Sequence, residues 1–409
     1  MYIQRNLEAI IIKYLKAPEI IAIVGPRQAG KTTLIQHLFK KLDKAISLSF
    51  DDLDVLTLFE KDINAFISTY IKGNKYLFID EFQQARNGGK ILKYIHDSQK
   101  IKIIISGSSV ADLTIRALKY LVGRILIFEL YTFDFAEFLR AKDANYLKVY
   151  QEYKNKINFW QDKKIDISAI IHKKLLNHYQ EYLLFGGYPR VVIEEDKESK
   201  KRILKNIYNT FFLREVKDIL GLIDDYKLNN LIKGLSLQIA NLIEYNELSR
   251  LSGYSYLSLK KYLNFLEKTY ICRLVRPFYK NKRTEVVKNP KIFFLDTGLR
   301  NIIADDFRSL DARTDKGMLL ENGLASQFIK QDKKINFWRD KKKNEIDFIM
   351  DLGNNKIIAV ESKSYLKNNH LVVAEKFQKK YSNIDLYFSY TDIDSKIKDR
   401  KRIYPVYLY

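Results

Sequence analysis

One short segment near the start of the chain constrains its fold more than any other feature. Residues 25–32 read Gly-Pro-Arg-Gln-Ala-Gly-Lys-Thr and fit the pattern G-x-x-x-x-G-K-[ST], which is typical of loops that wrap nucleotide phosphates. The apolar run Ile20–Val24 predicts a buried strand that enters this loop, and Thr33–Phe39 predicts a helix that leaves it. A strand, this loop and a helix in succession favour an αβα domain over a turn that matches by chance.

The residue types in this phosphate-binding loop (P-loop, residues 25–32) suit a polyphosphate ligand. Gly25 and Gly30 lack a Cβ atom, so the backbone can turn sharply and bring its N–H groups against anionic oxygens. The helix that follows adds the positive end of its dipole. Lys31 is predicted to reach the β- and γ-phosphates, and Thr32 is predicted to hold Mg²⁺ through its hydroxyl group. The predicted nucleotide contacts are Gly25, Pro26, Arg27, Gln28, Ala29, Gly30, Lys31, Thr32 and Thr33.

Acidic residues at the end of another predicted strand supply the second half of a nucleotide site. The run Tyr76–Ile79 is apolar throughout, as in a strand buried on both faces of a parallel sheet, and Asp80 and Glu81 follow it. Asp80 is predicted to bind Mg²⁺ through water, and Glu81 is predicted to polarise the attacking water. An ordinary strand that ends in two acidic turn residues is the alternative, and the P-loop upstream argues against it.

Three further residues are candidates for sensing the γ-phosphate or stabilising its transfer. The run Ile101–Ile105 predicts a third strand, followed by Ser106 and Ser108 at the edge where the γ-phosphate and the lytic water meet. Either serine is a candidate sensing residue, and a simple Ser/Gly turn is an equal alternative for each. Arg124 is a candidate arginine finger, with a structural role as its alternative.

Together these motifs resemble prokaryotic ATPases of the AAA+ class. More narrowly, the chain is similar to those in which the ATPase domain is followed by a domain of unknown function with a nuclease-like fold. The resemblance covers nearly the whole chain and implies ATP and Mg²⁺ as cofactors. A GTPase is a weaker alternative, because the chain has no Asn-Lys-x-Asp segment to read guanine. Further signatures of the group are residues 183–189 (Leu-Leu-Phe-Gly-Gly-Tyr-Pro), 289–291 (Asn-Pro-Lys) and 294–299 (Phe-Leu-Asp-Thr-Gly-Leu).

The resemblance and the pattern of apolar runs predict an α/β protein with four domains. Residues 1–140 are predicted to form the AAA+ P-loop ATPase core, an αβα domain with a parallel sheet, and residues 141–230 a helical lid. Residues 231–290 are predicted to form a winged-helix module. Residues 291–409 are predicted to form a restriction-endonuclease-like α/β domain that resembles PD-(D/E)XK nucleases. The polar stretch 141–164 is predicted to be a long connection.

The middle of the chain has a pattern typical of a winged helix. Tyr245–Leu251 and Ser258–Leu266 predict two helices across a turn at Gly253, and Tyr270–Val275 predicts a strand after them. In DNA-binding examples the second helix enters the major groove, whereas a spacer between domains is an equal alternative. The candidate phosphate contacts are Lys260, Lys261, Lys268, Lys280, Lys282 and Arg283.

Two strands near the C-terminus are predicted to bring carboxylates together. Glu345–Met350 predicts one strand, and Ile357–Val360 predicts another that ends at Glu361. Pairing of these strands would place Asp347 close to Glu361, with Lys363 alongside. Two carboxylates can hold Mg²⁺, which prefers oxygen ligands.

This spacing resembles the active site of PD-(D/E)XK nucleases, with Ile346 in place of the usual proline. The resemblance implies that Asp347 and Glu361 hold the metal, and that Lys363 orients or deprotonates the water that attacks phosphorus. Glu321, on a predicted helix, would support the metal as well. Because the D-x(n)-E-x-K pattern is short, an inactive relative that keeps the fold and binds nucleic acid or a partner stays an alternative.

Charge narrows the class of partner. The chain of 409 residues has 71 Lys and Arg against 49 Asp and Glu, which gives a net charge of +22. Such an excess attracts polyanions, so DNA is the expected partner, with a second copy of the chain or another protein as further partners. A general lysine-rich bias is the alternative. No apolar run reaches the length of a membrane span, so no membrane partner is expected.

Cysteine content and the N-terminus complete the prediction. The single cysteine, Cys272, excludes an internal disulfide and a multi-cysteine metal site. The N-terminus lacks the pattern of a signal peptide and predicts an amphipathic helix that packs on the ATPase domain, so a cytoplasmic location is expected. The sequence therefore predicts an ATPase that couples ATP hydrolysis to the handling of DNA. The alternative is an ATP-controlled protein-interaction switch with an inactive nuclease-like domain.

Overall fold

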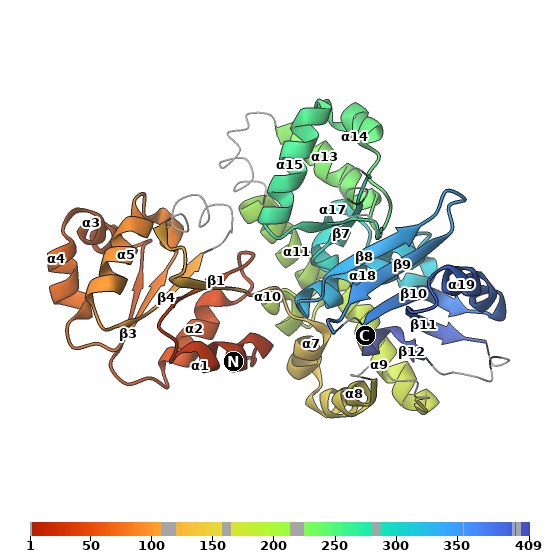
Figure 1. Cartoon of the computed structure of the whole chain (residues 1–409), viewed down its shortest axis with the longest axis horizontal. Helices are drawn as coiled ribbons and strands as arrows, with labels where there is room; N and C mark the ends of the chain where they lie inside the picture. Colours follow the sequence, from red (N-terminus) through yellow and green to blue (C-terminus); the bar gives the residue numbers. More distant parts are fainter. Residues whose placement is uncertain are drawn as a thin grey trace. The chain divides into compact units, whose positions relative to one another are not determined.

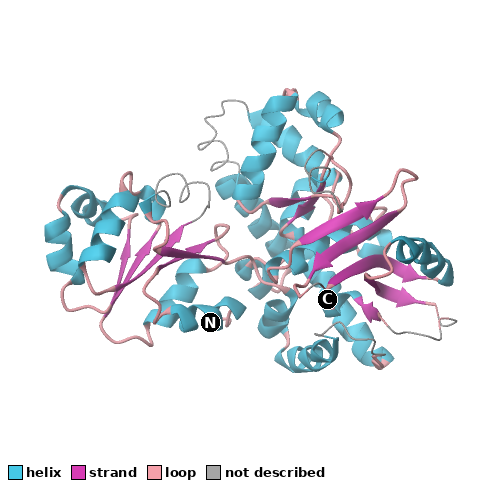
Figure 2. Cartoon of the chain, in the orientation of Figure 1, coloured by secondary structure: helices cyan, strands magenta, loops and turns pink. Residues whose placement is uncertain are grey.

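The computed structural model describes residues 2–107, 120–157, 165–212, 225–279, 285, 288–354, 356–394, 397 and 402–409. These residues divide into two compact units, each built from both helices and strands (Figures 1 and 2). The first unit contains Met1–Phe133 and Asn264–Ile271, and the second contains Asp134–Leu263 and Cys272–Tyr409. The three domains predicted beyond residue 140 remain predictions. Among the helices in the described ranges, none is both long and apolar enough to cross a membrane.

A parallel sheet of five strands forms the centre of the first unit, in the order β2-β3-β4-β1-β5. Strands β1, β3 and β4 are buried along almost their whole length, which explains their unbroken apolar sequences. The predicted α/β domain with a parallel sheet is thus confirmed. The strands are β1 (Ile20–Val24), β2 (Ala45–Ser49), β3 (Tyr76–Asp80), β4 (Lys102–Gly107) and β5 (Ile125–Glu129).

Helices of the first unit add to the core around this sheet. The N-terminal helix begins at Asn6, and its Ile11 is fully buried against Ile21 and Leu34 in one hydrophobic cluster, so the predicted amphipathic helix does pack on this domain. The helices are α1 (Asn6–Tyr14), α2 (Lys31–Phe39), α3 (Leu53–Lys61), α4 (Ile63–Phe66) and α5 (Gly88–Ser98), with the short turns η1 (Ile67–Ile71) and η2 (Phe82–Gln84).

The second unit begins with a run of helices, as the sequence predicted. Helix α8 (Ala144–Ile157) corrects one prediction, because residues 141–164 were expected to form a connection. Leu147, Tyr150 and Ile157 are buried on this helix, although polar residues surround them in the sequence. Residues 158–164 lie outside the described ranges. The other helices are α7 (Phe135–Lys142), α9 (Ala169–Phe185), α10 (Pro189–Ile193), α11 (Lys197–Asn206), η4 (Ile207–Phe212) and α13 (Asp225–Leu237).

The elements expected of a winged helix are present, and the winged helix itself remains a prediction. Helices α14 (Tyr245–Ser252) and α15 (Tyr256–Lys268) are followed by an antiparallel pair of strands, β6 (Cys272–Val275) and β7 (Lys291–Phe294). Leu259, Leu263 and Leu266 of α15 are buried, as their predicted common face required. Three of the candidate phosphate contacts, Lys280, Lys282 and Arg283, lie outside the described residues.

A second sheet, in the order β12-β11-β10-β9-β8, occupies the C-terminal part of the second unit. Strand β10 runs to Leu366, so Glu361 and Lys363 lie inside it rather than after its end, which corrects the predicted boundary. Because side chains alternate along a strand, these two residues share one face. The strands are β8 (Ile335–Arg339), β9 (Glu345–Asp351), β10 (Ile357–Leu366), β11 (Asp385–Ile393) and β12 (Ile403–Pro405), and the helices are α17 (Thr297–Ala304), η5 (Leu310–Ala312), α18 (Lys316–Lys330), α19 (Asn368–Lys380) and η6 (Val406–Leu408).

Two of the sequence signatures, residues 183–189 and residues 294–299, contact each other in this unit. Asp296 caps helix α17 by accepting a hydrogen bond from the Leu299 backbone N–H at 3.0 Å. Its second oxygen accepts a hydrogen bond from the Gly187 N–H at 2.8 Å. A Cβ atom on Gly186 would lie 2.0 Å from the Asp296 carboxylate, so a glycine is required at this contact. These signatures therefore form a packing joint between the loop after α9 and the start of α17.

Gly298→Ala is expected to lower the free energy of unfolding by roughly 1–3 kcal/mol, the usual range for overpacking in a core. A Cβ atom on Gly298 would lie 2.1 Å from the Phe185 carbonyl oxygen, so the backbone must shift to admit it. Urea unfolding followed by circular dichroism measures this loss. The control is Gly317→Ala on α18, where a Cβ atom meets nothing within 4 Å. Equal losses in both variants would contradict the packing joint.

Candidate functional site

The predicted P-loop joins β1 to α2 and depends on both of its glycines. A Cβ atom on Gly25 would lie 2.0 Å from the Leu130 carbonyl oxygen, so no larger residue fits there. Gly30 has a φ of 94° and stands at the N-cap of α2. Because Gly30 has no side chain, it leaves the N–H groups of the first helical turn uncapped. The start of α2 therefore suits an anion.

The Lys31 side chain is held against this loop. It is only 6% exposed, and its ammonium group donates hydrogen bonds to the carbonyl oxygens of Gly25 at 2.8 Å and Pro26 at 3.0 Å. The positive charge thus lies inside the curve of the P-loop, where the phosphates are predicted to bind. The remaining predicted contacts belong to the same loop, except Thr33, which lies in α2; Ala29 is fully buried and Gln28 has the left-handed φ of 59°.

Three of the predicted residues converge at the end of β3. Asp80 is buried, and its Oδ2 atom accepts a hydrogen bond from the Thr32 hydroxyl at 2.6 Å. Its Oδ1 atom accepts a hydrogen bond from the hydroxyl of Ser106, at the end of β4. The structure therefore brings together the two predicted Mg²⁺ ligands, and the donor set fits this ion, since hydroxyl and carboxylate oxygens are ligands that Mg²⁺ prefers. Ser108 lies outside the described residues.

The backbone at Glu81 is strained. This residue has a left-handed φ of 52°, which costs about 1–3 kcal/mol in a residue other than glycine and is common at functional sites. Its N–H donates to Asp80 Oδ1 at 3.1 Å, and its carboxylate accepts a hydrogen bond from the Gln83 side chain. Gln83 was not predicted, although an amide two residues after the proposed base was an available signal.

Arg124 lies where the strands of the sheet begin, opposite the strand ends that the P-loop follows. Its carbonyl oxygen accepts a hydrogen bond from the N–H of Ile20, the first residue of β1, whereas the P-loop follows the last residue of that strand. A five-residue strand spans roughly 16 Å. The guanidinium donates to both carboxylate oxygens of Asp97, at 2.8 and 3.2 Å, and these hydrogen bonds lower the pKa of Asp97 to about 2. The structure therefore does not bring this candidate arginine finger to the P-loop of its own chain.

Arg5 supports the P-loop and was not predicted. Its guanidinium donates to the carbonyl oxygens of Ala29 at 2.7 Å and Tyr131 at 2.6 Å, and it lies 4.9 Å from the centre of the Phe133 ring. These bonds tie the segment before α1 to the P-loop and to the chain that follows β5. Local sequence patterns contain no signal for this role, because the two carbonyl partners lie 24 and 126 residues away.

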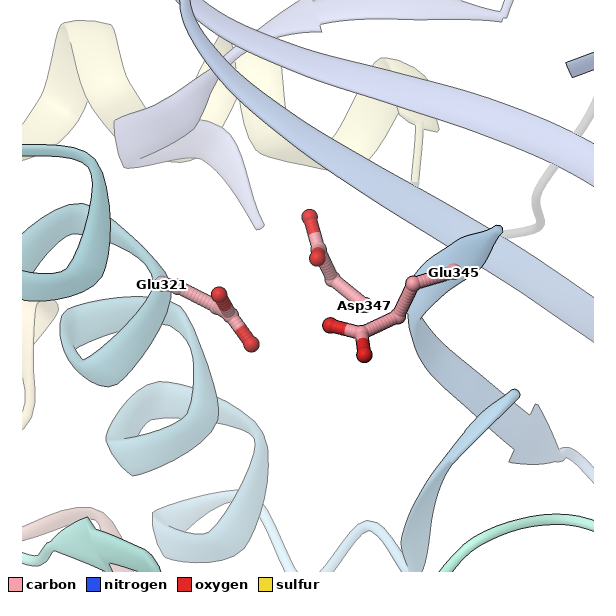
Figure 3. A group of neighbouring side chains, drawn as sticks. All are labelled: Glu321, Glu345 and Asp347. Atoms are coloured by element: carbon pink, nitrogen blue, oxygen red, sulfur yellow. The ribbon is translucent and has the colours of Figure 1, made fainter. Parts of the chain in front are cut away.

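A second cluster of charged side chains lies in the other unit. Figure 3 shows Glu321 on α18 and Glu345 and Asp347 on β9, with their carboxylates directed toward one another. One oxygen atom from each lies within 4.8 Å of the others. Glu345 was not predicted, although its position two residues before Asp347 places both side chains on one face of the strand.

The predicted residues of β10 join this cluster. The Asp347 N–H donates to Glu361 Oε2 at 3.3 Å, and the Ser362 N–H donates to Asp347 Oδ2 at 2.8 Å. The Lys363 ammonium donates to Glu361 Oε1 at 2.5 Å. Burial, followed by the charge of Asp347, raises the pKa of Glu361 to about 8. The structure thus brings together all three residues that the resemblance had singled out.

A buried lysine that was not predicted lies inside the cluster. The Lys291 ammonium is 2.8 Å from Glu321 Oε1, and it also forms an ion pair with Glu345. Burial lowers the pKa of Lys291, but the charges of Glu321, Asp347 and Glu345 outweigh burial and raise it overall. Glu345 accepts a further hydrogen bond from Arg339 at 3.1 Å. Two of the three predicted metal ligands, Glu321 and Glu361, are thus already paired with the ammonium groups of Lys291 and Lys363, so the cluster as built does not fit the predicted metal.

Glu361→Gln is expected to flatten the pH dependence of stability between pH 5 and 8. An unfolded glutamate loses its proton near 4.5, whereas folded Glu361 keeps its proton until about 8. The folded state therefore binds more protons in this window, and the free energy of unfolding of the wild type falls as pH rises. Urea unfolding at several pH values, with EDTA present, measures the slope. Glu152→Gln, at an exposed position of α8, is the control, and an unchanged slope in Glu361→Gln would contradict the assignment.

Three family models match successive parts of the chain. Residues 17–139 match the model described as an AAA domain. Residues 176–311 and 316–409 match two domains of unknown function, DUF8612 and DUF4143. The first match contains the P-loop and the strand that ends in Asp80.

Relatives over most of the chain are uncharacterized proteins. One from Methanocaldococcus jannaschii is 28% identical over 376 residues, which are 88% of this chain and 77% of that protein. One from Haemophilus influenzae is 24% identical over 323 residues, 73% of each chain.

Solved structures with a partial likeness include two nucleotide-binding proteins. A Walker-type ATPase of Pyrococcus abyssi has a TM-score of 0.45 and 15% identity, over 74% of this chain and 96% of that one. The ORC2 protein of Aeropyrum pernix, in its ADP form, has a TM-score of 0.36 and 13% identity, over 76% of this chain and 96% of that one. Likenesses at this level carry no inference about function. Residues 17–139 thus match an AAA domain and contain the P-loop geometry of an ATPase-like domain.

Proposed function

We propose that the chain binds ATP with Mg²⁺ and hydrolyses it at Lys31, Thr32, Asp80 and Glu81. One observation carries this proposal: the Thr32 hydroxyl and the Asp80 carboxylate meet at 2.6 Å beside a P-loop that holds a buried lysine. The match of residues 17–139 to the AAA domain supports the same class of reaction. The choice of ATP over GTP follows the resemblance to AAA+ proteins.

Each residue of the site has a separate task. The Lys31 ammonium contacts the β- and γ-phosphates, together with the N–H groups of the first turn of α2. Thr32 and Asp80 would hold Mg²⁺, which neutralises charge on the phosphates when it is bound. Glu81 orients and polarises the attacking water. Ser106, by its hydrogen bond to Oδ1, keeps the Asp80 carboxylate turned toward Thr32.

Lys31→Ala is expected to reduce ATP turnover at least about 10²-fold, as the loss of a charge-stabilising donor does in other enzymes. Phosphate release with Mg²⁺ and ATP measures turnover, and far-ultraviolet circular dichroism checks that the fold is kept. Lys93→Ala, at an exposed position of α5, is the matched control and should turn over ATP at the wild-type rate. Wild-type turnover in Lys31→Ala would refute the site.

Hydrolysis is coupled to the handling of DNA in this proposal. The net charge of +22 favours a polyanionic partner, and Lys260, Lys261 and Lys268 of α15 are exposed. The predicted winged helix places its second helix against DNA, and α15 is that helix. The meeting of Asp347, Glu361 and Lys363 on neighbouring strands supports the nuclease-like fold that the resemblance implies.

A protein-interaction switch is the second candidate, and one observation favours it. Leu257 is 78% exposed and Tyr256 is 49% exposed at the start of α15, and Leu251, near the end of α14, is 48% exposed. Exposed apolar side chains at the turn between α14 and α15 suit contact with a protein better than contact with phosphates.

Duplex DNA is expected to bind and to raise the rate of ATP hydrolysis. If three lysines contact phosphates, raising salt from 50 to 200 mM should weaken binding roughly 40-fold. Fluorescence anisotropy with a labelled duplex measures affinity, and phosphate release measures stimulation. Lys260→Ala/Lys261→Ala should weaken binding, whereas Lys93→Ala should not. Absence of a complex at low salt would favour the interaction switch instead.

A further inference from the structure

We propose that Lys291 is the resident cation of the C-terminal acidic cluster and that it excludes divalent metal ions from it, independently of ATP hydrolysis at the P-loop. The resemblance to PD-(D/E)XK nucleases implies a metal among these carboxylates. The contacts around Lys291 disagree with that implication.

The ammonium contacts two of the carboxylates that converge in this cluster. Glu321, Glu345 and Asp347 each bring one oxygen within 4.8 Å of the others, a spacing that ligands of a single ion can have (Figure 3). The Lys291 Nζ atom lies 2.8 Å from Glu321 Oε1 and is ion-paired with Glu345. The lysine therefore contacts two of the three carboxylates that would ligate a metal.

The protein fold holds Lys291 in this position. Its strand, β7, pairs with β6, where Lys291 lies opposite Val275. Asn322 of α18 fixes the same strand, because its side chain accepts from the Phe294 N–H at 2.8 Å and donates to the Phe294 carbonyl at 2.9 Å. These bonds set the position of β7 along α18, and hence of Lys291 beside Glu321. The Lys291 side chain is only 2% exposed, so it has no direct route into solvent.

The charges of the cluster are already compensated within the protein. Arg339 donates to Glu345 at 3.1 Å and Lys363 donates to Glu361 at 2.5 Å, in addition to the contacts of Lys291. A free metal ion must compete with cations that are tethered at high effective concentration. An ammonium group has no lone pair, so it cannot stay in the cluster as a metal ligand. The titratable groups of the cluster are the carboxyl groups of Glu321, Glu345, Asp347 and Glu361 and the cationic side chains of Lys291, Arg339 and Lys363.

The cluster is then a clamp that joins β7, α18 and β9, and it is not a site for metal-dependent cleavage. Each contact of Lys291 links two of these elements through an ion pair with the buried ammonium. Removing the ammonium takes away the counter-charge that Glu321 and Glu345 share, and such a group of closely spaced carboxylate oxygens takes up a divalent cation. Metal binding is therefore expected to appear when Lys291 is replaced by an uncharged residue of similar size.

Binding of Mn²⁺ alone to the full chain, without nucleotide, tests this inference. We expect electron paramagnetic resonance of free Mn²⁺ to show the same Mn²⁺ binding for the wild type and for Asp347→Asn. Lys291→Met should raise Mn²⁺ affinity at least roughly tenfold, because the tethered competitor is gone. Adding Asp347→Asn to Lys291→Met should abolish the gain. Supercoiled plasmid should stay intact with the wild type and Mn²⁺.

Lys200→Met is the matched control, since Lys200 is equally buried but bonds at 2.5 Å to Glu181, which is not part of the Glu321, Glu345 and Asp347 cluster. It should gain no Mn²⁺ site. If Lys291→Met does not fold, Lys291→Met/Glu345→Gln removes one negative charge as well and keeps the predicted ligands. Mn²⁺ binding or plasmid nicking by the wild type that depends on Asp347 would overturn the proposal, and so would folded Lys291 variants that gain no Mn²⁺. These readouts do not involve ATP, so their failure is separate from a failure of the ATPase proposal.

Discussion

The hydrogen bond between Thr32 and Asp80 depends on the parallel order of the sheet, and the nucleotide site depends on that bond. Strand β4 lies between β1 and β3, and Ser106 at its end is level with Ile23 of β1. Parallel pairing brings the carboxyl ends of all three strands to one edge. The Asp80 carboxylate is buried there, and the hydroxyls of Thr32 and Ser106 satisfy its two oxygens.

The two acidic sites of the chain differ in the kind of donor that satisfies them. At the P-loop the donor to Asp80 Oδ2 is a hydroxyl, whose lone pairs can ligate a metal once its proton is turned away. In the C-terminal cluster the donors to the Oε1 atoms of Glu321 and Glu361 are the ammonium groups of Lys291 and Lys363. An ammonium neutralises a carboxylate but offers no ligand atom. The first arrangement can therefore accept Mg²⁺ by a small rearrangement, whereas the second must lose a buried charge.

How well the sequence predicts a feature depends on how far apart in the sequence the residues that form it lie. The P-loop is made by consecutive residues, so its pattern was sufficient, and the buried face of α15 follows from helical spacing. Arg5 and Lys291 act on partners far along the chain, and no local pattern contains that information. Strand β10 was predicted too short because its apolar run stops where Glu361 enters the cluster. Arg124 directly precedes β5, a strand that the sequence analysis did not predict. That strand places Arg124 at the amino-terminal end of the sheet, away from the P-loop.

The signatures of the second unit specify geometry rather than a reaction. Asp296 joins the loop after α9 to α17, and Asn301 donates to the carbonyl oxygens of Leu183 and Leu184, both at 2.9 Å. Lys291, in the signature at residues 289–291, joins β7 to α18. Residues that resist substitution for packing reasons give a resemblance in sequence without requiring the same chemistry. The lysine that joins β7 to α18 also neutralises part of the acidic cluster, so we propose catalysis at the P-loop and not at that cluster.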